Sequence, residues 1–169
     1  MHNIINAEQK QIFDIVLKSI DNFNLNEQYL ISRDVSERCI CAKFANYLEK
    51  SILDSQFSEY VVDVEYNRGS KGNEYAAKML HGKNIVVDLI VHKRGFSEEI
   101  GFNNLICIEM KKGYKRVSLA SDKNRLRILT DDKLGFCYQA GYMLVAYADK
   151  KLDDYGLRIE SKYYNGIEF

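Results

Sequence analysis

Two short apolar segments, each carrying one carboxylate, place the strongest constraint on how this chain folds. In residues 85–92, IVVDLIVH, Asp88 has three apolar neighbours on each side, and in residues 104–111, NLICIEMK, Glu109 follows an apolar run. Short runs rich in β-branched residues predict buried β-strands. A carboxylate in a buried strand costs free energy unless it is paired or binds a cation. We therefore expect Asp88 and Glu109 to belong to a polar site within a sheet.

Lys111 extends the charged pattern of the second segment. Because side chains alternate along a strand, Glu109 and Lys111 project from one face while Met110 projects from the other. If the two segments are neighbouring strands, Asp88 lies beside Glu109, and the pair offers two oxygen ligands for a hard cation such as Mg²⁺. The simpler alternatives are an ion pair between Glu109 and Lys111 at a strand end, and an exposed edge strand for Asp88.

The rest of the chain predicts helices before and after a three-strand meander. Asn6 and Gln9 form a capping signal for the first helix, and Ser121 is expected to cap the last one. The expected helices cover residues 7–23, 35–53 and 122–129, and the expected strands cover residues 60–66, 85–92, 104–111 and 136–147. A turn at Asn165-Gly166 predicts a terminal hairpin. We expect an α/β fold in which helices flank a central mixed sheet.

Glu37 lies on the apolar stripe of the helix expected at residues 35–53. This stripe includes Cys41, and its extension by one turn toward the N-terminus reaches Glu37. A carboxylate on the core-facing side suggests a role in the site. Because Asp34 and Ser36 stand near the helix start, Glu37 could equally complete a helix cap or complement the helix dipole.

An Asp followed on the next strand by Glu-x-Lys resembles the PD-(D/E)XK nuclease superfamily, whose core is the restriction-endonuclease-like αβββαβ fold. The resemblance covers roughly residues 34–147, with Val87 at the position of the family's proline. Glu-x-Lys also occurs at residues 8–10 and 160–162, but neither copy follows an apolar strand that carries an Asp. The resemblance implies one domain over residues 1–169, with an extra N-terminal helix and a C-terminal β tail around the core.

The resemblance also implies a role for each residue of the site. Asp88, Glu109 and the Met110 carbonyl would bind Mg²⁺, with Mn²⁺ as a substitute, and Glu37 would be an outer or second-metal ligand. Lys111 would orient or deprotonate the attacking water. A cation would lower the pKa of Lys111 and the carboxylates would raise it, so Lys111 could instead remain charged and hold the phosphate.

Phosphodiester hydrolysis gives these residue types a common purpose. A bound metal lowers the pKa of water and offsets charge on the phosphoryl oxygens. The expected activity is therefore metal-dependent cleavage of a nucleic acid, with DNA as the first expectation. One alternative is a catalytically inactive accessory subunit of the same fold that binds nucleic acid or a protein partner. Another is an unrelated α/β metal enzyme that acts on a small phosphate ester.

The net charge of the chain is zero because 24 basic residues balance 24 acidic ones, which excludes a uniformly basic surface. The charges are nevertheless segregated. Residues 1–65 hold 6 basic and 11 acidic residues, whereas residues 111–133 hold 8 basic and 3 acidic ones. The basic segment could contact phosphates beside the site, although a solvated helix face explains part of it. The candidate nucleic-acid contacts are Arg68, Lys112, Lys115, Arg116, Lys123 and Arg125.

Apolar runs and cysteine spacing predict the cellular setting. The apolar runs are shorter than the roughly 18 residues of a membrane helix, and the first residues lack the pattern of a secretion signal, so we expect a cytoplasmic protein without a membrane partner. The four cysteines form no C-x-x-C pair, which favours free thiols. A chain of 169 residues leaves little room for a target-recognition domain, so we expect a homodimer or a partner protein.

Overall fold

The computed structural model describes residues 6–66, 68–71, 74–77, 79–80, 83–94, 103–113, 118–133 and 136–169. The helices are α1 (Ala7–Asn26), α2 (Gln28–Ser32), α3 (Glu37–Leu53) and α4 (Ala120–Thr130). The strands are β1 (Val61–Val64), β2 (Arg68–Lys71), β3 (Glu74–Ala77), β4 (Met79–Leu80), β5 (Lys83–Asn84), β6 (Leu89–His92), β7 (Asn104–Lys112), β8 (Ala140–Asp149), β9 (Asp154–Tyr164) and β10 (Ile167–Glu168).

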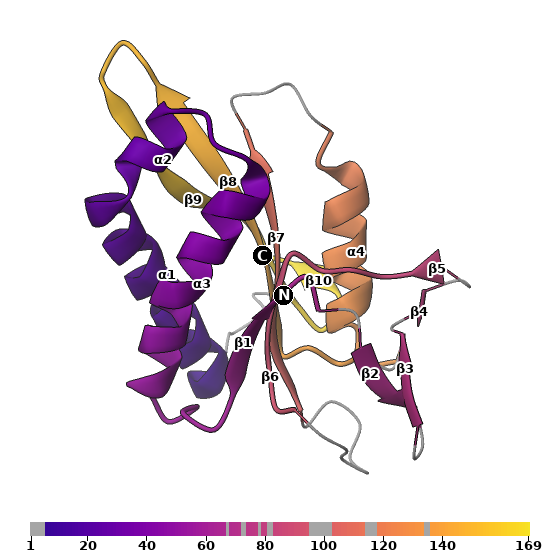
Figure 1. The fold of residues 1–169 in the computed structure, drawn as a ribbon. Helices are drawn as coiled ribbons and strands as arrows, with labels where there is room; N and C mark the ends of the chain where they lie inside the picture. Colours follow the sequence, from indigo (N-terminus) through magenta and orange to yellow (C-terminus); the bar gives the residue numbers. More distant parts are fainter. Residues whose placement is uncertain are drawn as a thin grey trace.

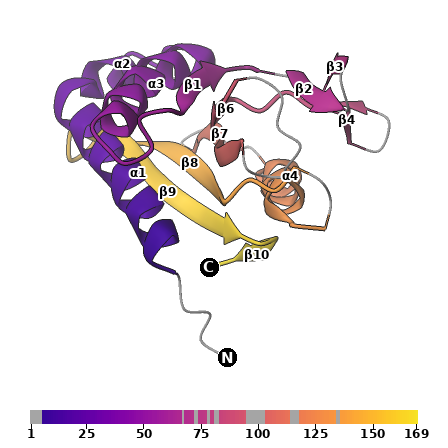
Figure 2. The same cartoon turned by 90° about the horizontal axis from the view of Figure 1, so that it is seen from below.

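A six-stranded mixed sheet forms the centre of the molecule, in the order β1-β6-β7-β8-β9-β10. The β7–β8 pair is parallel, and the other neighbours are antiparallel. Two small hairpins, β2–β3 and β4–β5, are inserted between β1 and β6. Helices α1, α2 and α3 cover one face of the sheet and α4 covers the other (Figures 1 and 2). The expected α/β architecture with a flanked mixed sheet is confirmed, as is the meander β1-β6-β7.

Local capping explains where the helices begin. The capping box between Asn6 and Gln9 is present at the start of α1. At α3, the Ser36 side chain accepts a hydrogen bond from the Cys39 N–H, so the third helical position belongs to Cys39 and a capping box through Glu37 is wrong. The expected cap by Ser121 is also wrong, because α4 begins at Ala120 and Ser121 lies within its first turn.

The strand expected at residues 85–92 is shorter than its apolar pattern, because β6 begins only at Leu89. The chain bends at Asp88, whose carbonyl accepts a hydrogen bond from the Glu65 N–H at 3.1 Å. Glu65 itself adopts a left-handed backbone conformation, with φ of 52°. The Asp88 carboxylate accepts a hydrogen bond from the Met110 N–H at 2.8 Å. Asp88 therefore leaves the regular ladder, and its side chain takes the place of a strand partner.

The chain ends in the expected hairpin. Asn165 and Gly166 connect β9 to β10 with φ angles of 49° and 72°, a turn in which both central residues have positive φ. Strand β8 starts four residues later than expected, at Ala140.

Two apolar clusters pack against the opposite faces of the sheet. The larger cluster lies under α1 and α3 and includes Ile108 and Met110 of β7. The smaller cluster lies under α4 and includes Cys107 of β7 and Leu126 of α4. Cys107, Glu109 and Lys111 alternate with Ile108 and Met110, so their side chains point toward α4, as the period of a strand requires. All four cysteines are free thiols, and Cys41 and Cys107 are buried.

Candidate active site

The polar site begins where β7 extends beyond its neighbour β6. Pairing between the two strands ends at Leu89 and Ile108, so the last four residues of β7 lack a β6 partner. The Met110 N–H donates to Asp88 Oδ2 at 2.8 Å, and the Lys112 N–H donates to Glu37 Oε2 at 2.8 Å. Two carboxylates therefore occupy the open edge of β7. The two backbone donors that they bond are two residues apart, a spacing of roughly 7 Å along a strand.

Glu109 is the most buried charged side chain of the site, with an exposed fraction of 1%. Arg125 of α4 approaches it, with Nη1 at 2.6 Å from Oε1. Burial, followed by the charge of Asp88, raises the pKa of Glu109 to about 8, and the nearby Arg125 guanidinium only partly offsets the rise. One guanidinium therefore does not fully compensate the negative charge gathered here.

Lys111 projects from the same face of β7 as Glu109. Its ammonium lies 3.7 Å from Asp122 Oδ2 and 3.9 Å from Glu37 Oε1. Burial by itself would lower the pKa of Lys111, but the carboxylates of Asp122 and Glu37 outweigh it, so the pKa is raised. Lys111 is consequently a cation held between acidic groups from α3 and α4.

Asp122 is a member of the site that was not among the residues expected from the sequence. It is buried on α4 and lies close to both cations, with Oδ1 at 3.5 Å from Arg125 Nη2. The available signal was the spacing of Asp122 and Arg125, which puts them one turn apart on the same helix face.

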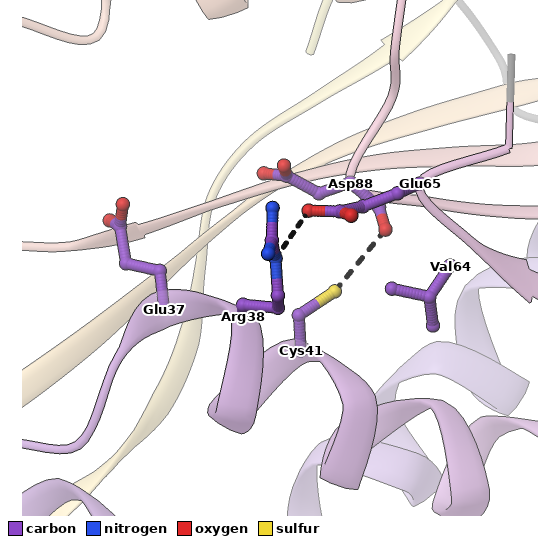
Figure 3. A pocket seen from close by; sticks show the side chains of 6 residues that line it. All are labelled: Glu37, Arg38, Cys41, Val64, Glu65 and Asp88. Carbon is purple, nitrogen blue, oxygen red and sulfur yellow. Dashed lines mark hydrogen bonds and ion pairs between the residues drawn. The ribbon is translucent and has the colours of Figure 1, made fainter.

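A cavity of about 210 Å³ adjoins the open edge of β7 (Figure 3). Its wall includes Glu37 and Asp88, and Arg38 reaches across it to Glu65, with Nε at 2.7 Å from Oε1. The Cys41 thiol donates to the Asp88 carbonyl at 3.4 Å. Burial and the charge of Asp88 raise the pKa of Cys41 to about 12, so this thiol is neutral and is no candidate nucleophile. Besides these five residues, Val64 lines the cavity.

The charges of the site do not balance. Among the described residues, four carboxylates contribute to it and two cations, Lys111 and Arg125, oppose them, for a formal charge of −2 when all are ionised. The neighbouring Arg38–Glu65 and Lys112–Asp34 pairs are each neutral overall. The carboxylates are those of Glu37, Asp88, Glu109 and Asp122.

When Glu109 is ionised, this deficit of positive charge equals the charge of one divalent cation. Within the part of the chain that the structure describes, no group of three or more His, Cys, Asp or Glu side chains is arranged to hold a metal. Mg²⁺, however, keeps several waters and uses only one or two protein carboxylates. Asp88, Glu109 and the Met110 carbonyl offer only oxygen donors, so the residues present fit a hard divalent cation in donor type.

The basic residues expected to contact nucleic acid lie in different surroundings. Lys112 is buried, and its ammonium contacts the Asp34 carboxylate and donates to the Val35 carbonyl at 2.7 Å. It is therefore a structural lysine rather than a surface phosphate contact. Lys123 lies 3.4 Å from Glu168 of β10. Arg125 contacts Glu109 and is only partly exposed to solvent. Lys115, Arg116 and the side chain of Arg68 lie outside the described residues.

Among the described residues, no helix combines the length and the apolar character needed to cross a membrane. We compared the whole chain with protein-family models, with curated proteins and with solved structures. None of the three comparisons gives a match.

Proposed function

We propose that the protein is a divalent-cation-dependent nuclease that hydrolyses phosphodiester bonds, with DNA as its substrate. We further propose that it has the restriction-endonuclease-like core of the PD-(D/E)XK superfamily, because the elements α3, β1, β6, β7, α4 and β8 follow the order αβββαβ. The observation that carries the proposal is the open edge of β7. There Asp88, Glu109 and Lys111 gather in a cluster that is short of positive charge.

Each of these residues has a distinct task in the proposed reaction. When bound, a divalent cation supplies a more acidic water and offsets charge on the phosphoryl oxygens. The carboxylates of Asp88 and Glu109 would hold it together with the Met110 carbonyl, since the N–H and C=O of a strand residue point to the same edge. Asp122 and Glu37 restrict the Lys111 ammonium from two sides, so it can orient the attacking water or stabilise the phosphate.

A second candidate is a catalytically inactive protein of the same fold that binds nucleic acid or a protein partner. The Arg125–Glu109 ion pair favours this alternative, because it neutralises the most buried carboxylate without a metal. The backbone N–H groups of Met110 and Lys112 likewise occupy Asp88 and Glu37. The cluster could then be structural, and activity is the property that separates the two candidates.

The deciding experiment titrates Mg²⁺ and Mn²⁺ into the wild-type protein with supercoiled plasmid, linear duplex, single-stranded DNA and RNA. We expect cation-dependent cleavage of DNA, and its loss in Asp88→Asn, whose amide oxygen can still accept the Met110 N–H. Glu160→Gln is the matched control, because Glu160 is exposed on β9 within another Glu-x-Lys sequence. Full activity in Asp88→Asn would refute the site.

The four substrates also separate the two candidates. Binding of DNA by the wild type without cleavage at any cation concentration would favour the inactive protein. The expected homodimer or partner protein stays a prediction, which gel filtration of the active species tests.

A further inference from the structure

Arg125 forms an ion pair with the buried carboxylate of Glu109. The Glu109 carboxylate is buried, and among the described residues Arg125 is the cation within ion-pair distance of it. Arg125 Nη1 also lies 3.4 Å from the Val86 carbonyl, near the bend that presents Asp88. The guanidinium therefore lies beside the oxygen donors that would hold a divalent cation.

Asp122 gives this guanidinium a second carboxylate on its own helix. Nη2 of Arg125 lies 3.5 Å from Asp122 Oδ1, whereas Nη1 lies 2.6 Å from Glu109 Oε1. The Arg125 side chain is 32% exposed, so it lies at the boundary between the buried site and solvent. If the contact with Glu109 breaks, Arg125 retains an acidic neighbour and stays beside the site.

A divalent cation and Arg125 cannot both be the close partner of Glu109 without mutual repulsion. Two positive charges a few ångströms apart in a partly buried site repel each other strongly. Breaking the ion pair on cation binding would relieve this repulsion, and the observed cation affinity would then be reduced by the free energy of that step. A freed guanidinium is well suited to a phosphate, which it binds through paired N–H groups.

We propose that Arg125 is an exchangeable counterion: it holds Glu109 in the cation-free protein, gives way when a divalent cation binds, and then contacts the phosphate of the substrate. The inference rests on the proposed nuclease function and adds a residue to it. Glu109 is then paired with Arg125 when the cation is absent, and the freed guanidinium lies beside the cation when it is bound. Arg125 is then a regulator of cation affinity as well as a substrate-binding residue.

The test measures Mn²⁺ affinity without nucleic acid, by isothermal titration calorimetry, alongside DNA cleavage. Arg125→Gln should bind Mn²⁺ at least about tenfold more tightly than the wild type, because the competing charge is gone. The same variant should cleave DNA at least about tenfold more slowly, because the phosphate contact is lost. Arg127→Gln is the control, since Arg127 is exposed on α4 and bonds Asn124. It should match the wild type in both measurements.

A second measurement uses the wild-type protein and so does not depend on the folding of a variant. The arginine side-chain N–H signals are followed by NMR during a Mg²⁺ titration, with the Arg125 signal assigned by its absence in Arg125→Lys. We expect this signal to shift or exchange faster with solvent as Mg²⁺ is added, while the Arg127 signal stays unchanged.

Equal or weaker Mn²⁺ binding by Arg125→Gln, or an unchanged Arg125 signal in saturating Mg²⁺, would overturn the exchange. Wild-type protein that cleaves DNA in either case would leave the proposed function intact. Wild-type protein that neither binds Mn²⁺ nor cleaves any polymer would overturn both.

Discussion

Lys111 and Lys112 are consecutive residues of one strand, yet their surroundings differ in kind. The Lys112 ammonium is buried against a carboxylate and two backbone carbonyls, those of Asp34 and Val35. The Lys111 side chain is three times as exposed, at 24% against 8%, and its ammonium lies between two carboxylates at 3.7 and 3.9 Å. Close hydrogen bonds to the backbone are typical of a structural charge. A cation that lies between two carboxylates suits a site that must accommodate a substrate.

The largest expected effect is on catalysis by Lys111. Lys111→Met should reduce DNA cleavage by about 10³-fold or more, which corresponds to about 4 kcal/mol of transition-state stabilisation. The free energy of unfolding should fall, but by less than in Lys112→Met, because the Lys111 side chain is more exposed and its ion pairs are longer. Cleavage rates at saturating Mg²⁺ and urea unfolding measure the two quantities. A variant that cleaves normally, or one that fails to fold, would break the comparison.

Lys112→Met should show the reverse pattern. We expect the free energy of unfolding to fall by about 3 kcal/mol, because the Asp34 and Val35 carbonyls lose their donor and the Asp34 carboxylate loses its cation. The folded fraction should retain the cleavage rate of the wild type per folded molecule. Urea unfolding with correction of the rate for folded protein tests this, and unchanged stability would contradict the structural role.

Glu109→Gln sharpens the comparison from the acidic side. Because the pKa of Glu109 is raised to about 8, its proton stabilises the folded state below about pH 4.5, and this contribution is lost as the pH rises through 8. The amide carries no charge, so the variant should be more stable than the wild type at pH 8.5 in EDTA. The gain should be on the order of 1–2 kcal/mol, since losing the charged bond to Arg125 offsets part of it.

The control for this experiment is the same pair of proteins at a lower pH. Urea unfolding at pH 4.5 should show a much smaller difference between Glu109→Gln and wild type than at pH 8.5. A difference that is independent of pH would mean that Glu109 is not the titrating group.

The smallest effect is expected in the Glu-x-Lys copy on β9. Glu160 is exposed and lies 3.8 Å from Arg158, an ion pair of the kind that contributes under about 0.5 kcal/mol. Glu160→Gln should therefore change neither DNA cleavage nor the urea midpoint by more than the error of measurement. An effect on cleavage comparable to that of Lys111→Met would move the site away from β7.

The sequence was sufficient for the parts of the fold that depend on local pattern. The capping box at Asn6, the meander and the turn at Asn165 follow from short-range rules that involve a few neighbouring residues. The apolar pattern predicted a longer β6 than the structure has. The Met110 N–H bonds the Asp88 side chain in place of regular strand pairing, and the periodicity of a sequence does not reveal such a bond.

The composition of the site was only partly predictable for the same reason. Alternation along a strand correctly put Glu109 and Lys111 on one face. The Arg125–Glu109 contact joins two elements through tertiary packing, and the sequence showed only that a basic segment lies nearby. Lys112 was expected to contact nucleic acid but is buried. Strand alternation puts its side chain on the opposite face of β7 from Lys111. Its acidic partner Asp34 lies 78 residues earlier, so no local pattern indicates the pair.

The open edge of β7 has a consequence for solubility as well. A strand that outruns its neighbour exposes backbone donors that can recruit a strand from another molecule, which is a route to aggregation. Asp88 and Glu37 occupy the donors of Met110 and Lys112 and bring negative charge to the same edge. Removing both side chains at once, in Asp88→Ala with Glu37→Ala, would therefore leave these two donors without their acceptors. The acids proposed to serve the reaction therefore also satisfy the backbone donors at the end of β7.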